Sequence, residues 1–214
     1  MEVRPLAVGH ERSGRTRNRD NQFVNISELV EIDWSVFDTS SILGHHPKDG
    51  VSLGKNNGQV LEWMRGRLEN GEAREANWYV TERVLKQLGS ENYLSSCIEI
   101  EGKRRIEFLE ELERDRRVLH PEMLPSDARI QYDEVHEDFE AYLRLNGKLE
   151  EADAEITSIG YSLATSGEDV VVATNDFGIV QARNDVVNYM RVRNDKFMTA
   201  VHRGGLHFEI TECQ

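Results

Sequence analysis

The sequence predicts an α/β protein with three layers (α/β/α), in which helices cover both faces of a central parallel sheet of four to five strands. The stretch VVVATNDFGI at 170–179 begins with three valines and an alanine, which predict a strand buried on both faces, as in parallel sheets. Short apolar runs alternate along the chain with segments of helical apolar spacing. The 214 residues, 38% hydrophobic and 30% charged, are typical of a soluble globular protein with a full core.

The elements in the first half are separated by residues that favour turns and caps. In chain order we expect a strand at 35–37, a loop at 44–57, a helix at 58–70, a strand at 78–80 and a helix at 81–88. The first strand breaks at Asp38, and the loop is rich in Gly, Pro, Asn and Asp. The first helix has apolar residues at helical spacing and ends at Asn70-Gly71. Thr81 is a good N-cap for the second helix, which ends at Gly89.

The second half continues the alternation. We expect helices at 103–119 and 133–145, a helix that starts at 150–156, a strand at 170–173, a helix from 177 to 200 and a strand at 206–210. The first of these helices is highly charged, with a thin apolar stripe of Ile106, Leu109 and Leu112. Helices between strands imply crossover connections and therefore a parallel sheet.

Charge is unevenly distributed along the chain. The net charge of −13 argues against binding nucleic acid by broad electrostatic attraction. The first 20 residues instead carry five Arg against three acids, a net charge of +2. We expect residues 1–33 to be a flexible basic N-terminal arm and lead-in, and 34–214 to form the folded domain. We interpret the arm as a solvated tail; contact with a phosphate backbone is the alternative.

The sequence contains no apolar stretch long enough for a signal peptide or a membrane span. We therefore expect a cytoplasmic protein without membrane association. Its two cysteines have neither a metal-binding spacing nor a disulfide framework.

Four acidic residues share one kind of position, at the end of a strand or the start of a helix: Asp38, Glu82, Asp153 and Asp176. Each alone has an ordinary explanation, because acids near helix N-termini complement the dipole and cap the helix. Open α/β sheets, however, place their active sites at the carboxyl ends of the strands. Several carboxylates gathered in one pocket would need a cation or would take up protons.

The four segments that carry these acids resemble, in order, the motifs of PIN-domain nucleases, which include the VapC-like ribonucleases. FDTSSIL resembles the first motif, YVTERVLKQL the second, EADAEITSIGYSLA the third and VVVATNDFGI the fourth. The resemblance covers residues 34–210 and implies a PIN-like nuclease domain. In the fourth motif, Phe177-Gly178 stand where many members place another acid, so this motif would supply one carboxylate only.

The resemblance implies a metal-dependent endoribonuclease of the toxin or RNA-processing type, with Asp38, Glu82, Asp153 and Asp176 as catalytic and metal-binding residues. Asp38 and Asp176 would bind Mg²⁺ or Mn²⁺ directly, and the other two directly or through water, because all-oxygen ligands select hard ions. We expect Ser40 and Arg83 on the substrate side, Ser40 holding the Asp38 carboxylate or a water. RNA is the implied substrate, and an antitoxin or other protein partner and a homodimer remain open.

Two other classes of protein are kept as alternatives. One is a catalytically silent PIN-fold scaffold that binds RNA or protein, which would have no reason to retain four mutually repelling acids. The other is an unrelated doubly wound α/β protein, such as a phosphotransfer domain. The absence of a D-x-D pattern at Asp38 and of a GxxxxGK[ST] loop counts against common forms of the latter.

Overall fold

The computed structural model describes residues 23–44, 58–75, 77–90, 102–147, 149–190, 197–203 and 206–211. The strands are β1 (Phe23–Asn25), β2 (Trp34–Phe37), β3 (Trp78–Thr81), β4 (Val118–Leu119), β5 (Val170–Thr174), β6 (Phe197–His202) and β7 (His207–Thr211). The α-helices are α1 (Ile26–Leu29), α2 (Thr39–Leu43), α3 (Gln59–Glu69), α4 (Glu82–Gly89), α6 (Gly102–Arg114), α7 (Ser126–Gly147), α8 (Glu151–Thr165) and α9 (Phe177–Met190). Two short 3₁₀ helices are η2 (Glu72–Glu75) and η3 (Pro121–Met123).

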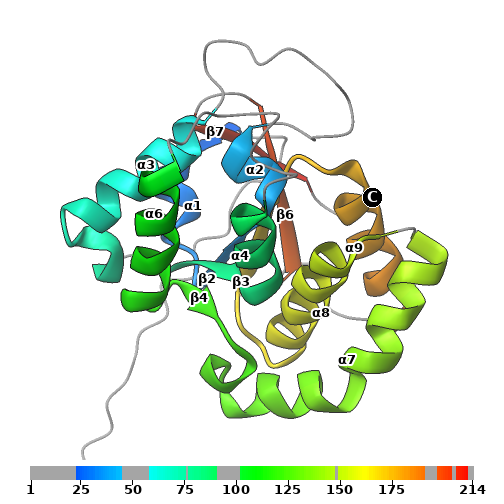
Figure 1. Ribbon diagram of the computed structural model, residues 1–214. Helices are drawn as coiled ribbons and strands as arrows, with labels where there is room; N and C mark the ends of the chain where they lie inside the picture. Colours follow the sequence, from blue (N-terminus) through cyan, green and yellow to red (C-terminus); the bar gives the residue numbers. More distant parts are fainter. Residues whose placement is uncertain are drawn as a thin grey trace, which may run out of the picture.

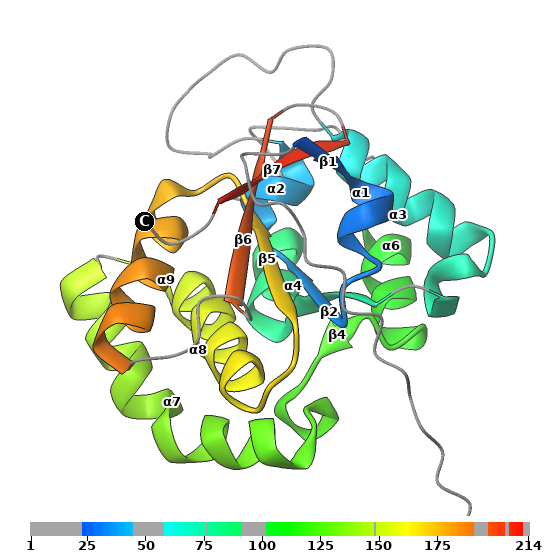
Figure 2. The ribbon, with the colours of Figure 1, turned by 180° about the vertical axis from the view of Figure 1, so that it is seen from behind.

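The strands form one seven-stranded sheet in the order β1-β7-β6-β5-β2-β3-β4. β6, β5, β2, β3 and β4 are parallel, and β7 and β1 extend the sheet with antiparallel pairs. Helices flank the sheet, with α1, α3 and α6 to one side and α7, α8 and α9 to the other in both views (Figures 1 and 2). The predicted α/β class is therefore confirmed, with a sheet somewhat larger than the expected four to five strands.

The centre of the sheet contains the point where the chain changes direction. From β2 the chain moves outward to β3 and β4, and it then returns to the other side of β2 to form β5 and β6. β2 and β5 are therefore parallel neighbours whose following loops lead to opposite sides. Such a switch point leaves a crevice at the carboxyl ends of the two strands, which is where open α/β sheets bind ligands.

The core explains why the central strands are so apolar. All five residues of β5 are buried, as expected for a strand covered on both faces. α8 packs closely on β6, because a Cβ on Gly160 would lie 2.5 Å from Cε2 of the buried Phe197 ring. This position therefore admits only glycine without a rearrangement.

Two long helices expected from the sequence are shorter, and each is followed by a strand. The helix expected at 103–119 ends at Arg114. Two residues later, Arg116 adopts a left-handed φ of 56°, which turns the chain so that Val118 pairs with Val80. The helix expected at 177–200 ends at Met190, and residues 197–201 pair with β5. Both predictions were wrong because pairing with a neighbouring strand outweighs a local apolar pattern that is compatible with either structure.

Other differences lie at element boundaries. The helix expected at 133–145 extends over the whole of α7, from Ser126 directly after Pro125. Within the expected lead-in, β1 pairs with β7, and α1 places Ile26 and Leu29 in the core. In the part of the chain that the structure describes, no helix is both long and apolar enough to cross a bilayer.

Candidate functional site

Asp38 and Asp176 follow the two strands that meet at the switch point. Phe37 pairs with Ala173, and the backbone N–H of Asp38 donates to the Ala173 carbonyl at 2.9 Å, so the two strands end side by side. Asp38 is also the N-cap of α2, where its side chain accepts from the N–H of Ser40. The capping role and the strand-end position considered for such acids therefore coincide in one residue.

Two hydroxyl groups hold the Asp38 carboxylate in place. Ser40 Oγ and Thr174 Oγ1 both donate to Asp38 Oδ2, the latter at 2.9 Å, beside the N–H of Ser40 at 3.2 Å. The same hydroxyls accept from the N–H groups of Asn175 and Asp176, each at 2.9 Å. Because the bonds converge on Oδ2, Oδ1 is the oxygen better placed for a further ligand.

Asp153 approaches this pair from the first turn of α8. Its side chain accepts from the N–H of Glu150 at 3.2 Å, and the residue is only 8% exposed. Burial raises the pKa of Asp153 to about 8, and the charges of Asp38 and Asp176 act in the same direction. The structure thus brings three of the four predicted acids into one electrostatic neighbourhood.

The pKa of Asp38 is raised as well. Burial is the largest cause, the hydrogen bonds from Ser40 and Thr174 oppose it, and the charge of Asp176 adds to it. Asp176 in turn accepts from the N–H of Gly178 at 2.6 Å through Oδ1. A site of this kind at neutral pH either holds protons or gains from a cation that neutralises it.

The donor set suits a hard divalent ion, because carboxylate oxygens are the ligands that Mg²⁺ and Mn²⁺ prefer. Within the described residues, however, no three His, Cys, Asp or Glu side chains are arranged closely enough to form a metal site as they stand. Any ion would therefore have to draw the three carboxylates together. The match to Mg²⁺ or Mn²⁺ lies in the oxygen ligands that these side chains supply, and not in a preformed geometry.

Glu82 lies apart from the other three acids. Its side chain is 48% exposed and pairs with Lys86 Nζ at 2.9 Å, with His120 Nδ1 at 4.0 Å. The hydrogen bond and charge of Lys86 lower the pKa of Glu82. The α4 side chain that reaches the Asp38 region is Gln87, whose Oε1 accepts from Thr39 Oγ1 at 2.5 Å. Five residues at 100° each place Glu82 about 140° around the helix from Gln87.

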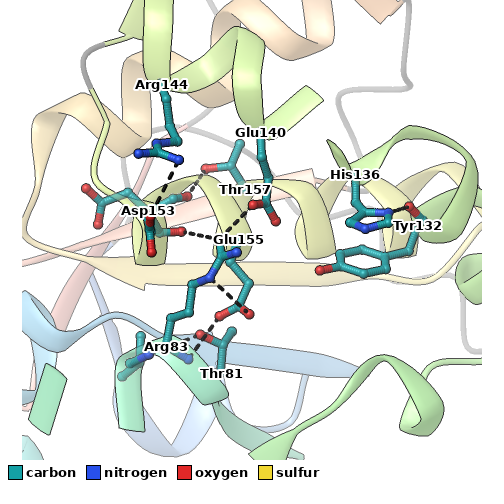
Figure 3. A network of polar contacts seen from close by, with 11 residues as sticks. Thr81, Arg83, Tyr132, His136, Glu140, Arg144, Asp153, Glu155 and Thr157 are labelled. Carbon is teal, nitrogen blue, oxygen red and sulfur yellow. Dashed lines mark hydrogen bonds and ion pairs between the residues drawn. The ribbon is translucent and has the colours of Figure 1, made fainter. Parts of the chain in front are cut away.

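Arg83 is held within the protein by several partners. Its Nη1 lies 2.6 Å from Glu140 Oε2 and donates to the Glu151 carbonyl at 2.9 Å, while its Nε is 3.9 Å from Glu155 Oε1. Figure 3 shows its guanidinium extending from α4 between Glu140 on α7 and Glu155 on α8. Ser40 is likewise used inside the protein, since it holds Asp38, which was one of its two expected roles.

Glu155 forms a second buried acidic position close to Arg83. It accepts from the Arg83 N–H at 3.2 Å and from the Thr81 hydroxyl, and burial raises its pKa against these bonds. Glu140 is also buried, with its Oε1 lacking a hydrogen-bond partner. Ion pairs between α4, α7 and α8 therefore fix the position of the turn that carries Asp153 (Figure 3).

A pocket of about 490 Å³ lies between α4 and the junction of α7 with α8, and several of its lining residues are neighbours of residues in the carboxylate site. Its lining includes Ala152, which directly precedes Asp153, and Glu150, whose backbone N–H donates to the Asp153 side chain. It also includes Gln87, which is bonded to Thr39 next to Asp38. Leu149, another lining residue, would lie 3.3 Å from a Cβ on Gly178, whose N–H donates to Asp176. The remaining lining residues are Arg83, Lys86, Ser90, Arg144 and Glu151.

Several site residues were missed by sequence reasoning. Thr174 could have been found, because it ends the valine strand directly before the polar turn. Gln87 could not, because its role depends on how α4 is rotated against α2. The basic residues of the first 20 positions and both cysteines lie outside the described residues.

Comparisons with models of protein families, with curated proteins and with solved structures gave no match. The function is therefore argued from the site itself and from the motifs that carry the resemblance.

Proposed function

We propose that this protein is a Mg²⁺- or Mn²⁺-dependent endoribonuclease of the PIN-domain type. The observation that carries the proposal is the convergence of Asp38, Asp153 and Asp176, from three separate segments, at the switch point of the sheet. Buried acids with raised pKa values in a crevice are typical of functional sites. An ordinary set of helix caps would not require that three carboxylates repel one another.

In this proposal the three aspartates would hold the ion, and Glu82 would not take part. A bound ion would supply positive charge beside the scissile phosphate and a water of lowered pKa. Ser40 and Thr174 orient Asp38 by occupying its Oδ2. The network of Arg83 with Glu140 and Glu155 fixes α8 and with it Asp153.

The test is cleavage of end-labelled single-stranded RNA by the purified protein in Mg²⁺, Mn²⁺ or EDTA. We expect cleavage with either ion and none in EDTA. Asp38→Asn and Asp176→Asn should each abolish cleavage without unfolding the protein, while Glu82→Gln should retain it. If Asp38→Asn cleaves as fast as the unaltered protein with the same metal dependence, the assignment of the site is wrong.

A silent scaffold of the same fold is the second candidate. It is favoured by the lack of a preformed three-ligand metal group among the described residues and by the neutral Gln87 at the α4 position nearest Asp38. Titration of Mn²⁺ followed by calorimetry separates the two candidates, because the scaffold predicts no binding that depends on Asp38 and Asp176. Expression of the protein in a growing culture would then distinguish a toxin from a processing enzyme, because a toxin should arrest growth.

A further inference from the structure

The pocket beside the carboxylates differs in charge from the rest of this acidic protein. Three of the side chains that line it are cations: Arg83, Lys86 and Arg144. Its volume of about 490 Å³ falls within the range of small-ligand pockets, roughly 300–1,000 Å³. The chain as a whole carries a net charge of −13. A group of cations gathered at one pocket of such an acidic protein indicates that this pocket binds an anionic ligand.

We propose that Lys86 and Arg144 bind the phosphate group that neighbours the scissile one in a single-stranded RNA, at the mouth of this pocket. The inference rests on the proposed nuclease function and assigns the side of the site on which the RNA strand is held. Arg83 also lines the pocket, but the proposal does not use it, because its guanidinium already has partners within the protein.

The ion pairs of the three cations separate these roles. Arg83 is bonded to the nearly buried Glu140 at 2.6 Å, and removing a partner from such a pair leaves an uncompensated buried charge. Lys86 and Arg144 have side chains 70% and 53% exposed, and they pair with the exposed Glu82 and Glu151. Exposed pairs of this kind contribute at most about 1 kcal/mol, so a phosphate can replace the carboxylate at little cost.

The two acids in the lining do not remove this preference. Glu150 accepts from the backbone N–H of Asp153 in the capping box of α8, and Glu151 is the partner of Arg144. Apart from Arg83, which Glu140 and Glu155 neutralise, the lining therefore offers the exposed cations Lys86 and Arg144, and each carboxylate in it already has a partner.

The position of the pocket suits a phosphate adjacent to the one that is cleaved. Gln87 links it to Asp38 through Thr39, and Leu149 links it to Asp176 through Gly178. A strand whose scissile phosphate lies at the three aspartates would place a neighbouring phosphate over the pocket. Cations there offset the repulsion that the aspartates exert on the RNA backbone.

The experiment measures binding separately from cleavage. Fluorescence anisotropy of a labelled single-stranded RNA is recorded in Mg²⁺ between about 50 and 200 mM salt, a range over which phosphate binding weakens steeply, with every variant in the Asp38→Asn background. The matched control is Arg129→Gln, which lies on α7 like Arg144 and is similarly exposed, at 49%, but outside the pocket. Thermal melts show that all variants are folded.

We expect Lys86→Gln with Arg144→Gln to weaken binding about tenfold, since each cation contributes a charge-assisted hydrogen bond. The slope of log K against log salt should fall by about 0.7 in magnitude, the value for one phosphate of a single strand that is no longer neutralised. The Arg129→Gln control should bind as the background does. If the double variant binds with the affinity and slope of the control, the pocket does not hold phosphate.

The two proposals fail differently. RNA binding that depends on Lys86 and Arg144, without any cleavage by the unaltered protein in Mg²⁺ or Mn²⁺, supports the pocket and overturns the nuclease. Cleavage that depends on Asp38 but is insensitive to both cations supports the nuclease and overturns the pocket.

Discussion

Asp153→Asn should stabilise the protein in the absence of divalent ions, by an amount that grows with pH. The folded pKa of Asp153 is about 8 against a usual value of 3.8, so between these values the folded state binds more protons than the unfolded chain. The free energy of unfolding of the unaltered protein therefore falls as the pH rises through this window. Asparagine keeps an oxygen for the Glu150 N–H without the charge.

The magnitude follows from about 1.4 kcal/mol per pKa unit, which over the three units from pH 5 to pH 8 gives an upper limit of about 4 kcal/mol. Relaxation and entry of water offset part of this cost, and we expect about half, or ~2 kcal/mol. For a chain of this length that corresponds to a melting temperature higher by about 4–8 °C at pH 8. At pH 5 the advantage should be smaller by this amount, because only the first part of the window between 3.8 and about 8 has been crossed.

The assay is thermal unfolding in EDTA at pH 5 and pH 8. Glu151→Gln is the control, because it removes a carboxylate from the same turn of α8 that is 62% exposed and pairs with Arg144. The stability of this variant relative to the unaltered protein should be the same at both pH values. If Asp153→Asn is no more stable than the unaltered protein at pH 8, or if its advantage is equal at both pH values, the reasoning about a crowded buried acid is refuted.

Two further variants test the packing and the hydroxyl contacts. Gly160→Ala should lower the free energy of unfolding by about 1–3 kcal/mol in a urea titration, because its Cβ would overlap the Phe197 ring. Gly66→Ala, in another helix with open space around it, should instead raise it by up to about 1 kcal/mol, and equal effects would contradict the packing argument. Thr174→Val should lower the free energy of unfolding by about 1–3 kcal/mol, because it removes the hydroxyl that donates to Asp38. The loss should be greater at pH 9 than at pH 5, because this hydrogen bond stabilises the ionised carboxylate. A cost independent of pH would show that the hydroxyl does not support that charge.

Much of the fold could be predicted from local patterns. β5 was evident from its uninterrupted apolar residues, and α4 from Thr81 and the apolar spacing behind it. The segments at 118–119 and 197–202 were not, because such short segments become strands only when a neighbouring edge supplies the hydrogen bonds. The same limit applied to β1, a three-residue strand paired with β7.

The candidate site was predictable in part. Asp38 and Asp176 follow predicted parallel strands, so sheet geometry alone brings them to one edge. Glu82 fits the motif equally well in sequence, but the rotation of α4 turns it toward Lys86 and His120. Neither helix rotation nor the pairing of Arg83 with Glu140 is encoded in local spacing.

The amino-acid sequence by itself determined the α/β class and the positions of acids at strand ends and helix starts, because these depend on periodicity and capping over a few residues. Only the tertiary structure decided which of those acids meet, and which cations remain at the surface beside them. Burial and charge–charge distance depend on how α4, α7 and α8 pack against the sheet, and that packing is set by contacts between residues far apart in the chain.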